Sequence, residues 1–309
     1  MTAARRNGSV VCISYLALAE LWRVPLFPAA NHGAAVTDVE QSTAADAPMA
    51  AAVLSALNVP TLLITNPIGD DEDGRTVHRW LRQRGVKTNV PPTPDVVTPW
   101  IVVVADDQHT RTWFAHLPGV AARLATADLA PVANASFVYL DAYELIEEAA
   151  VRAIRAAKAV QVPLLLNLGG SPLSDRIRSA VAGHGQLLVQ TNVNDDEHRD
   201  APALASALLA QTGASWVVVT AGAFGAVAVS RTKEIARPAF PVKVRHTHSA
   251  GAAFSGGLLY GLRSGWSVER SMVLGSASGA LRCARHHGAP LPTLAELESF
   301  AAQRQPAAS

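Results

Sequence analysis

The sequence is poor in several features that mark particular classes of protein. It has only two cysteines in 309 residues, Cys12 and Cys283, too few for a disulfide framework. Both lie in apolar runs, which indicates buried free thiols in a reducing compartment. No Cys/His spacing suits a tetrahedral metal site, so we expect no zinc. The formal net charge is +1 and no run of basic residues occurs, which leaves no electrostatic basis for binding nucleic acid.

Long hydrophobic runs are missing as well. No apolar stretch reaches the ~20 residues that a membrane-spanning helix needs, so we expect no membrane contact. Arg5-Arg6 and the apolar residues 10–19 resemble a short secretory signal. The same apolar residues also fit a first buried strand. We favour this second interpretation, which makes the protein cytoplasmic.

The chain does have an alternation of apolar strand-like and helical segments. The strand-like runs are too apolar for a sheet with one face in water, and helical stretches separate them. We expect strands at 10–18, 61–65, 137–140, 163–168, 187–190 and 216–220. This alternation predicts a parallel sheet covered by helices on both faces. With 309 residues, the chain suits one large α/β domain.

The most informative stretch is residues 246–257, His-Thr-His-Ser-Ala-Gly-Ala-Ala-Phe-Ser-Gly-Gly. It follows a short strand-like run and opens an apolar helix with small residues. The first turn of a helix has unpaired N–H groups and the positive end of the helix dipole, so it can hold an anion. Small residues can equally serve only to let the helix pack closely against a sheet. The sequence leaves both interpretations open.

This stretch resembles the signature of the ribokinase-like (PfkB) family of sugar and nucleoside kinases. The family pattern is Asp-Thr-x-Gly-Ala-Gly-Asp-x-Phe, followed one residue later by Gly-Gly. The matching residues are Thr247, Ala250, Gly251, Phe254, Gly256 and Gly257. The resemblance implies a three-layer α/β/α sandwich with a mostly parallel central sheet, with residues 1–309 in one domain. It also implies a small β lid formed by about residues 20–43 and 97–116, through which family members often pair as homodimers.

Other segments match the family in order and spacing. Residues 68–74 resemble its Val-Gly-x-Asp-x-x-Gly segment, and residues 111–114 resemble a lid strand. Residues 217–226 resemble the nucleotide-side strand with its Gly-x-x-Gly turn. The resemblance covers roughly residues 10–303, and it implies that ATP or ADP phosphates would contact one set of residues. These are Thr220, Gly222, Gly225, Ser249, Ala250 and Gly251.

Three departures fall on residues that carry the family's chemistry. His246 replaces the first Asp of the signature, Ser249 replaces its first Gly, and Ala252 replaces the Asp that serves the family as catalytic base. Alanine cannot accept a proton, so the family's usual phosphoryl transfer should be absent or weak. A nucleotide site depends instead on the glycines and the helix dipole. Whether ATP or ADP with Mg²⁺ still binds stays open.

The substrate and metal positions differ too. The family has an Asp after the first strand, where the nearest acid here is Glu20, and its Gly-Gly…Asn motif corresponds to the region of residues 44–49. Its Asn-x-x-Glu segment for magnesium resembles residues 192–195, in which Asn192 is kept and Asp195 is one methylene shorter. Two further residues, Asp141 and Tyr143, follow a predicted strand. Strand ends of open α/β sheets bind ligands, so we place Glu20, Asp141 and Tyr143 in the candidate substrate cleft.

His246 and His248 are additions to which the family pattern gives no role. Two imidazoles beside a helix start could act as acid and base near neutral pH, or be ordinary polar residues at a strand end. We expect His286 and His287 at a solvated helix terminus.

The expected function is that of a kinase-like protein that lacks ordinary kinase chemistry and binds a small polar metabolite or nucleotide. Two alternatives stay open. One is an active enzyme, either a small-molecule kinase with an unusual base or a cleft that uses His246 or His248 for other chemistry. The other is an interaction module that uses the lid surface.

Overall fold

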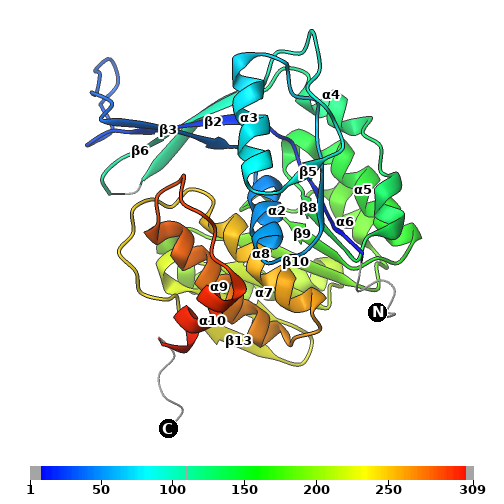
Figure 1. Ribbon diagram of the computed structural model, residues 1–309. Coiled ribbons are helices and arrows are strands. Elements are labelled where there is room, and N and C mark those ends of the chain that lie inside the picture. The colour runs from blue at the N-terminus through cyan, green and yellow to red at the C-terminus, as the bar shows by residue number, and fades with distance from the viewer. Residues whose placement is uncertain (1–7, 109, 304–309) are drawn as a thin grey trace.

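The computed structural model describes residues 8–108 and 110–303, so Arg5-Arg6 and His109 lie outside the described residues. Its main element is a nine-stranded sheet. The strands are β1 (Val10–Ile13), β4 (Thr61–Ile64), β5 (Lys87–Thr88), β8 (Phe137–Asp141), β9 (Leu164–Asn167), β10 (Leu187–Asn192), β11 (Trp216–Thr220), β12 (Ala226–Val229) and β13 (Glu234–Arg237). Their order is β13-β12-β11-β10-β9-β8-β1-β4-β5 (Figure 1). Only β12 pairs antiparallel, with β11 and β13, which confirms the predicted mostly parallel sheet.

Helices cover both faces of this sheet. The first layer holds α2 (Ala47–Ala56), α3 (Glu72–Gln83), α8 (Ala250–Arg263), α9 (Val268–Ala284) and α10 (Leu294–Ala302). The second holds α4 (Val120–Ala125), α5 (Glu147–Ala159), α6 (Asp175–Val181) and α7 (Ala201–Thr212). Successive strand residues point to opposite faces, so Cys12 joins the first apolar cluster and Val11 the second. The three-layer sandwich is therefore as expected. No helix in the described part of the chain is long and apolar enough to span a bilayer.

The first strand is shorter than predicted. It ends at Ile13 because the chain turns away at Leu16, whose N–H donates to Oδ1 of Asn66 at 2.9 Å. The chain then enters a second sheet, which we call the lid. Its strands are β2 (Leu18–Arg23), β3 (Asp38–Thr43), β6 (Trp100–Ala105) and β7 (Arg111–His116), in the order β3-β2-β6-β7. Buried Ala19, Leu21 and Ile101 form its apolar base. Strands β6 and β7 pair antiparallel with each other.

Small residues let α8 lie very close to its neighbours. A Cβ added at Gly257 would lie 2.8 Å from the carbonyl oxygen of Leu274 and 2.9 Å from the Cα of Gly275, both on α9. A Cβ at Gly256 would lie 2.6 Å from Val53 on α2. Close packing is thus one reason for the small residues of this helix. It does not explain Gly251 in the first turn, where an added Cβ would meet nothing within 4 Å.

We expect Gly257→Ala to lower the free energy of unfolding by about 1–3 kcal/mol, the cost of overpacking a well-packed core. The obstacle is backbone, which cannot turn aside as a side chain would. Urea unfolding would measure the change. Gly251→Ala is the matched control: the same methyl enters open space, and alanine has the better helix propensity, so stability should not fall. Equal stability of the two variants would contradict this account of the packing.

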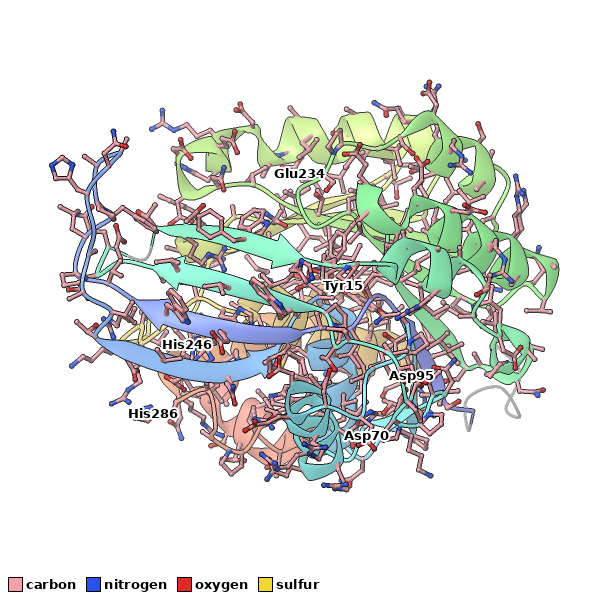
Figure 2. All side chains as sticks on the ribbon, turned by 90° about the horizontal axis from the view of Figure 1, so that it is seen from above. Tyr15, Asp70, Asp95, Glu234, His246 and His286 are labelled. Carbon is pink, nitrogen blue, oxygen red and sulfur yellow. The ribbon has the colours of Figure 1, made fainter. Side chains whose placement is uncertain are left out.

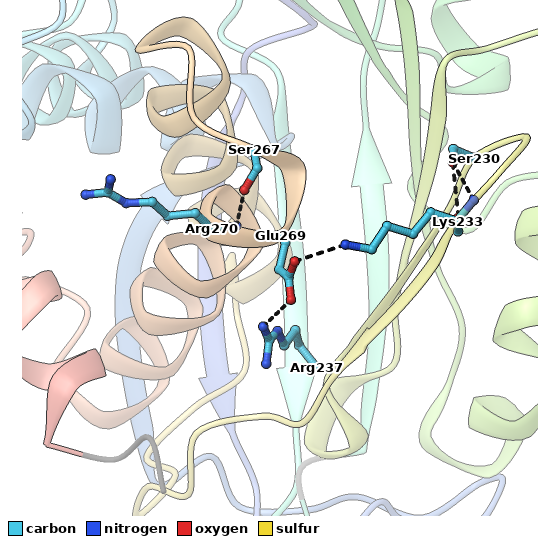
Figure 3. Close-up of polar contacts among 6 residues, drawn as sticks. All are labelled: Ser230, Lys233, Arg237, Ser267, Glu269 and Arg270. Atoms are coloured by element: carbon cyan, nitrogen blue, oxygen red, sulfur yellow. Dashed lines mark hydrogen bonds and ion pairs between the residues drawn. The ribbon is translucent and has the colours of Figure 1, made fainter. Parts of the chain in front are cut away.

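Ion pairs join the far edge of the main sheet to α9. Glu269 contacts Lys233 at 3.2 Å and Arg237 at 2.5 Å, and Ser267 caps the helix by accepting from the N–H of Arg270 at 3.2 Å (Figure 3). A hollow of about 530 Å³ beside this group is lined by residues that include Arg237 and Glu269. None of its lining residues is among those that the sequence singles out for function.

Candidate functional site

Polar side chains gather where β1, β8 and β9 end, at the carboxyl edge of the main sheet. Asp141, the last residue of β8, is fully buried. Its Oδ2 accepts hydrogen bonds from the backbone N–H groups of Asp46 at 3.1 Å and Ala47 at 2.9 Å. Free N–H groups and the dipole at a helix start both favour a carboxylate there. Asp141 therefore fixes the start of α2 to the edge of the sheet.

Asp46 and Asp141 form a carboxylate pair joined by Asn167, the last residue of β9. Nδ2 of Asn167 lies 2.9 Å from Oδ2 of Asp46, from Oδ1 of Asp141 and from the hydroxyl of Tyr139. The amide orientation follows from its Oδ1, which accepts from the N–H of Gly169 at 3.1 Å. Three oxygens thus share the two amide protons of Asn167.

The surroundings raise the pKa values of both carboxyl groups. Burial, and then the charge of Asp46, raise the pKa of Asp141 to about 7. Burial also raises the pKa of Asp46, although hydrogen bonds from Tyr143 and Asn167 and the charge of Arg111 act in the opposite direction. Two carboxylates this close resist being ionised together. Burial therefore raises the pKa values of both carboxyl groups.

The lid brings a positive charge to this edge. Arg111, the first residue of β7, is exposed, and its Nη1 donates to the carbonyl oxygen of Thr247 at 3.4 Å. Tyr143 packs edge to face on Tyr15, with 6.1 Å between ring centroids. Figure 2 shows Tyr15 at the base of the lid strands. Asp141 and Tyr143, both predicted for the substrate cleft, thus lie together.

Glu20 lies elsewhere. Side chains alternate along a strand, and the register of β2, β6 and β7 puts Leu21 on the face of Arg111 and Glu20 on the opposite face. There Oε2 of Glu20 accepts from Nε1 of Trp22 at 3.1 Å. The structure therefore does not bring Glu20 to the carboxylate pair, because the first strand ends early and residues 18–23 form a lid strand instead.

The start of α8 keeps an open anion position but offers no base. Ser249, the residue before the helix, has φ 60° and makes no side-chain cap. Ala250 is half-buried and Gly251 is exposed. Ala252 is fully buried, so its methyl group faces the protein interior. Gly251 is exposed in the first turn, and the methyl group of Ala252 cannot accept a proton.

Two turns at this edge have positive φ without glycine. They are Ala45 (φ 69°) and Ser249 (φ 60°), and the family signature to which residues 246–257 are similar has glycine at the position of Ser249. A left-handed conformation costs an L-residue roughly 1–2 kcal/mol, whereas glycine adopts it freely. The backbone of both turns is therefore held by its surroundings against this cost.

We expect Ala45→Gly to raise the free energy of unfolding by about 0.5–1 kcal/mol. Glycine removes the free-energy cost of the left-handed conformation in the folded protein. This gain exceeds the stability that is lost because glycine raises the conformational entropy of the unfolded chain. Ala44→Gly is the control, since Ala44 has no positive φ and should only lose stability. Urea unfolding of the two variants would test this, and a loss in both would contradict it.

The histidines form a cluster beside the lid, made of His246, His248 and His287. The ring of His287 stacks on that of His246 with 3.5 Å between centroids and lies 5.7 Å from that of His248. Its Nδ1 accepts from Nη2 of Arg282 at 2.8 Å. Burial lowers the pKa of His248 to about 3 and that of His287 to about 2. All three rings lie at the helix-start loop or against it.

The prediction of a solvated His287 is wrong. The loop after α9 turns this side chain inward, between His246 and the buried Arg282, and it keeps 7% exposure. His286 is exposed as predicted. Figure 2 shows His246 near the lid strands and His286 farther out.

The predicted nucleotide side is only partly open. The hydroxyl of Thr220 donates to the carbonyl oxygen of Thr191 at 3.4 Å. Gly222 and Gly225 have φ 49° and 95°, and an added Cβ would collide with Asp195 or with the backbone of Arg237, respectively. Backbone packing therefore requires glycine at position 225, after the short helix η4 (Gly222–Phe224), whereas at Gly222 the left-handed φ of 49° favours glycine.

A magnesium site fits these residues poorly. Asn192 ends β10 and is exposed, while the carboxylate of Asp195, in the short helix η3 (Asp195–Asp200), lies against Gly222. One amide and one carboxylate are few ligands for Mg²⁺. Within residues 8–108 and 110–303, no group of three or more His, Cys, Asp or Glu side chains is placed to hold a metal ion.

A model of the pfkB family of carbohydrate kinases matches residues 9–294. The chain belongs to the PfkB family. It is 27% identical over 265 residues to the 5-dehydro-2-deoxygluconokinase of Bacillus subtilis. The aligned residues cover 75% of this chain and 78% of that enzyme. It is 30% identical over 104 residues to the enzyme of the same name from Geobacillus kaustophilus, 31% of each chain. The family predicted from the signature is confirmed.

Solved structures agree on the fold. The nucleoside kinase of Methanocaldococcus jannaschii, a ribokinase-family member, superposes with a TM-score of 0.77 at 17% identity, covering 96% of this chain and 98% of that one. The ribokinase of Arabidopsis thaliana, solved with ribose and ATP, gives 0.73 at 18% identity, covering 95% and 98%. At such identities the likeness shows the PfkB-type fold alone.

Three site residues escaped the sequence analysis. Asp46 lies between alanines, Asn167 ends a buried strand, and Arg111 begins a lid strand. A polar residue directly after an apolar strand was a usable signal for Asn167, as it was for Asp141. Nothing in the sequence links Asp46 to Asp141, because 95 residues separate them.

Proposed function

We propose that this PfkB-family protein binds a small polar, sugar-like metabolite under its lid and lacks ordinary phosphoryl transfer. The observation that carries the proposal is Ala252. It is buried at the start of α8, at the position where the family signature has its catalytic Asp. A general base contributes about 10²–10⁴-fold to rate, and an alanine contributes none of it.

The rest of the edge supports binding. The carboxylate pair, Arg111 and the two tyrosines present acceptors, donors and a charge at the carboxyl end of the sheet, where open α/β folds bind ligands. Gly251 leaves the first turn of α8 open to an anion. A nucleotide could therefore be a second ligand, with Mg²⁺ coming mainly with its phosphates.

Thermal unfolding tests the proposal. The full chain would be heated with each of a panel of sugars, sugar acids and sugar phosphates, and with ADP or ATP plus Mg²⁺. A ligand of the folded state stabilises it by about 2.7 kcal/mol at a hundredfold excess over its dissociation constant. At least one sugar-like compound should raise the midpoint. If none does at millimolar concentration, the binding proposal fails.

An active kinase is the second candidate. The relation to 5-dehydro-2-deoxygluconokinase over three quarters of the chain favours it. Such an enzyme would need a base other than residue 252. His248 and His287 are poor choices, since burial lowers their pKa values to about 3 and about 2, far from the near-neutral value that suits a base.

We also propose that the lid pairs with a second copy of the chain. Trp113 and Phe114 on its edge strand β7 are 67% and 64% exposed, and an open edge strand with apolar side chains favours association. Light scattering should give twice the chain mass of 32.4 kDa, and Trp113→Lys with Phe114→Lys should reduce it. If the protein is a monomer at all concentrations, the homodimer is excluded. If such a monomer still binds its ligand, the exposed lid surface is free for another protein partner.

A further inference from the structure

Two loops meet beside the lid, and histidine side chains join them. The first, which we call the α8 loop, is residues 245–248, and the second, the α9 loop, is residues 285–290. Nε2 of His246 donates to the carbonyl oxygen of Arg285 at 3.0 Å. The ring of His287 stacks on that of His246, with 3.5 Å between the centroids. Imidazole rings therefore hold the start of α8 to the end of α9.

The contact between Arg282 and His287 needs a neutral imidazole. Nη2 of Arg282 lies 2.8 Å from Nδ1 of His287, and Nη1 donates to the carbonyl oxygen of His287 at 3.2 Å. Arginine has donors only, so Nδ1 must accept this hydrogen bond and cannot carry a proton. Arg282 is 3% exposed, and no carboxylate oxygen in the described part of the chain lies within 4.0 Å of its nitrogens. A proton on His287 would break the hydrogen bond and add a second positive charge beside a buried cation.

The groups that face His248 and His287 are mostly cationic or neutral. They are Arg111 on β7, Arg84 at the end of α3, Arg282 and Cys283 on α9, His246 and His286 in the two loops, and Glu40 on β3, the acid of the group. Burial, followed by the charges of Arg282 and Arg111, lowers the pKa of His248 to about 3. Burial, followed by His246 and Arg282, lowers the pKa of His287 to about 2. Cations on several elements therefore oppose a proton on either ring.

The α8 loop also contacts the lid. Nη1 of Arg111, on the lid strand β7, donates to the carbonyl oxygen of Thr247 at 3.4 Å. On the other side of the loop, the carbonyl oxygen of Cys283 accepts from the backbone N–H groups of Arg245 and His246 at 2.9 and 3.4 Å. The loop is thus held between the lid and α9, and it lies against Cys283, which is half-buried. Release of the loop would loosen the lid and expose Cys283 further.

We propose that the α8 and α9 loops form a pH-sensitive latch, in which protonation of His248 and His287 separates the two loops and releases the lid strand β7. The latch is closed while both imidazoles are neutral, and it opens in mild acid. This inference goes beyond the proposed function, since it concerns how access to the start of α8 is controlled. Histidine changes its charge between pH 5 and 8, and protonation of histidine clusters is a known way to switch an interface.

The expected size of the effect follows from linkage between opening and protonation. In the open form both rings are in water, where an imidazole has a pKa of about 6.5. For each ring that opening exposes, the ratio of open to closed molecules is multiplied by about 11 at pH 5.5 but only by about 1.1 at pH 7.5. Two rings therefore raise this ratio about 100-fold over the two pH units. The closed form is favoured above about pH 6.5 and loses this advantage as the pH falls below it.

Thiol labelling of the full chain tests the latch, because its two cysteines report different events. Cys283 should react when the α8 loop opens, whereas the fully buried Cys12 should react only when the main sheet unfolds. A dipyridyl disulfide reacts with thiols even in mild acid, and mass spectrometry of the peptides would assign the labelled site. Rates would be divided by the rate for glutathione at the same pH. The corrected rate at Cys283 should rise at least tenfold between pH 7.5 and 5.5, while Cys12 stays unlabelled.

Two variants test the residues. His248→Gln and His287→Gln each keep a polar side chain that cannot be charged, and glutamine at position 287 can still accept from Arg282. Each variant should reduce the acid-induced rise about tenfold, and the double variant should remove it. His32→Gln, which changes an exposed histidine, is the matched control and should leave the rise unchanged.

Three outcomes would overturn the latch. The first is a corrected rate at Cys283 that is the same at both pH values. The second is labelling of Cys12 in parallel with Cys283, since unfolding of the whole chain would then explain the result. The third is an equal rise in the parent and in both single variants, which would also decide the matter if the double variant failed to fold. None of these outcomes depends on a bound metabolite, so failure of the latch leaves the proposed function intact.

Discussion

Phosphorylation of sugars by ATP should be slower than in an ordinary kinase by at least 10²-fold, whatever sugar is offered. Sugar and nucleoside kinases need a base, magnesium and in-line alignment, and kinases typically turn over at 1–100 s⁻¹. Residue 252, which matches the position of the catalytic Asp in the family signature, is a buried alanine, and loss of a general base lowers a rate by about 10²–10⁴-fold. Magnesium ligands are few, and lost alignment can cost more still. ADP release in a coupled assay, over the full panel of sugars, would measure the rate.

Ala252→Asp is the informative variant for this prediction. It restores the family's residue, but position 252 is fully buried in the structure, and a carboxylate there pays a desolvation cost. We expect no more than a small gain in rate and a loss of stability. Turnover of 1–100 s⁻¹ by the parent protein would refute the prediction. In that case Asp46→Asn would show whether the carboxylate pair serves as the base.

Stability should fall on mild acidification, and His287 should be a main cause. The pKa of His287 is about 2 in the folded protein because of burial and the neighbouring His246 and Arg282, against an ordinary value near 6.5. As the pH falls below about 6.5, His287 is therefore protonated in the unfolded chain but stays neutral in the folded protein. The stability from a neutral His287 is present above about pH 6.5 and is lost as the pH falls below it. Between pH 7 and 5 the loss is about 2 kcal/mol.

The carboxylate pair acts in the opposite direction. The pKa of Asp141 is raised to about 7, so the stability it contributes is present at low pH and is lost as pH rises through 7. From pH 7 to 5 it adds about 2 kcal/mol, whereas His248 and His287 together remove about 4 kcal/mol. The histidines therefore decide the sign of the change.

Urea unfolding at pH 5, 6 and 7 tests both contributions. His287→Gln should flatten the acid loss, because glutamine can still accept from Arg282 and cannot be charged. Asp141→Asn should make stability fall more steeply with acid, because it removes the stabilisation that protonation of Asp141 gives at low pH. His32→Gln, an exposed histidine, should leave the slope unchanged. A parent stability that rises from pH 7 to pH 5 would contradict the account.

The sequence by itself determined the fold and the family, and it has an alanine where the family signature has an Asp. Apolar strands alternating with helices require a sheet covered on both faces, because their side chains need burial on both sides. The signature around residues 246–257 led to the PfkB family, and the alanine at position 252 could be read directly because it lies within that short, ordered motif. Local patterns of this kind carry their information within a few residues.

Only the tertiary structure decided which polar and charged side chains come together in the candidate site. Asp46 and Asp141 meet across 95 residues, and the lid strand β7 places the charge of Arg111 where it acts on Asp46. His287 looked like a solvated helix end until the loop after α9 placed it against His246 and Arg282. Burial and contacts between distant segments set the pKa of a group and its access to a ligand. The residues that neighbour the group in the sequence determine neither its burial nor these contacts.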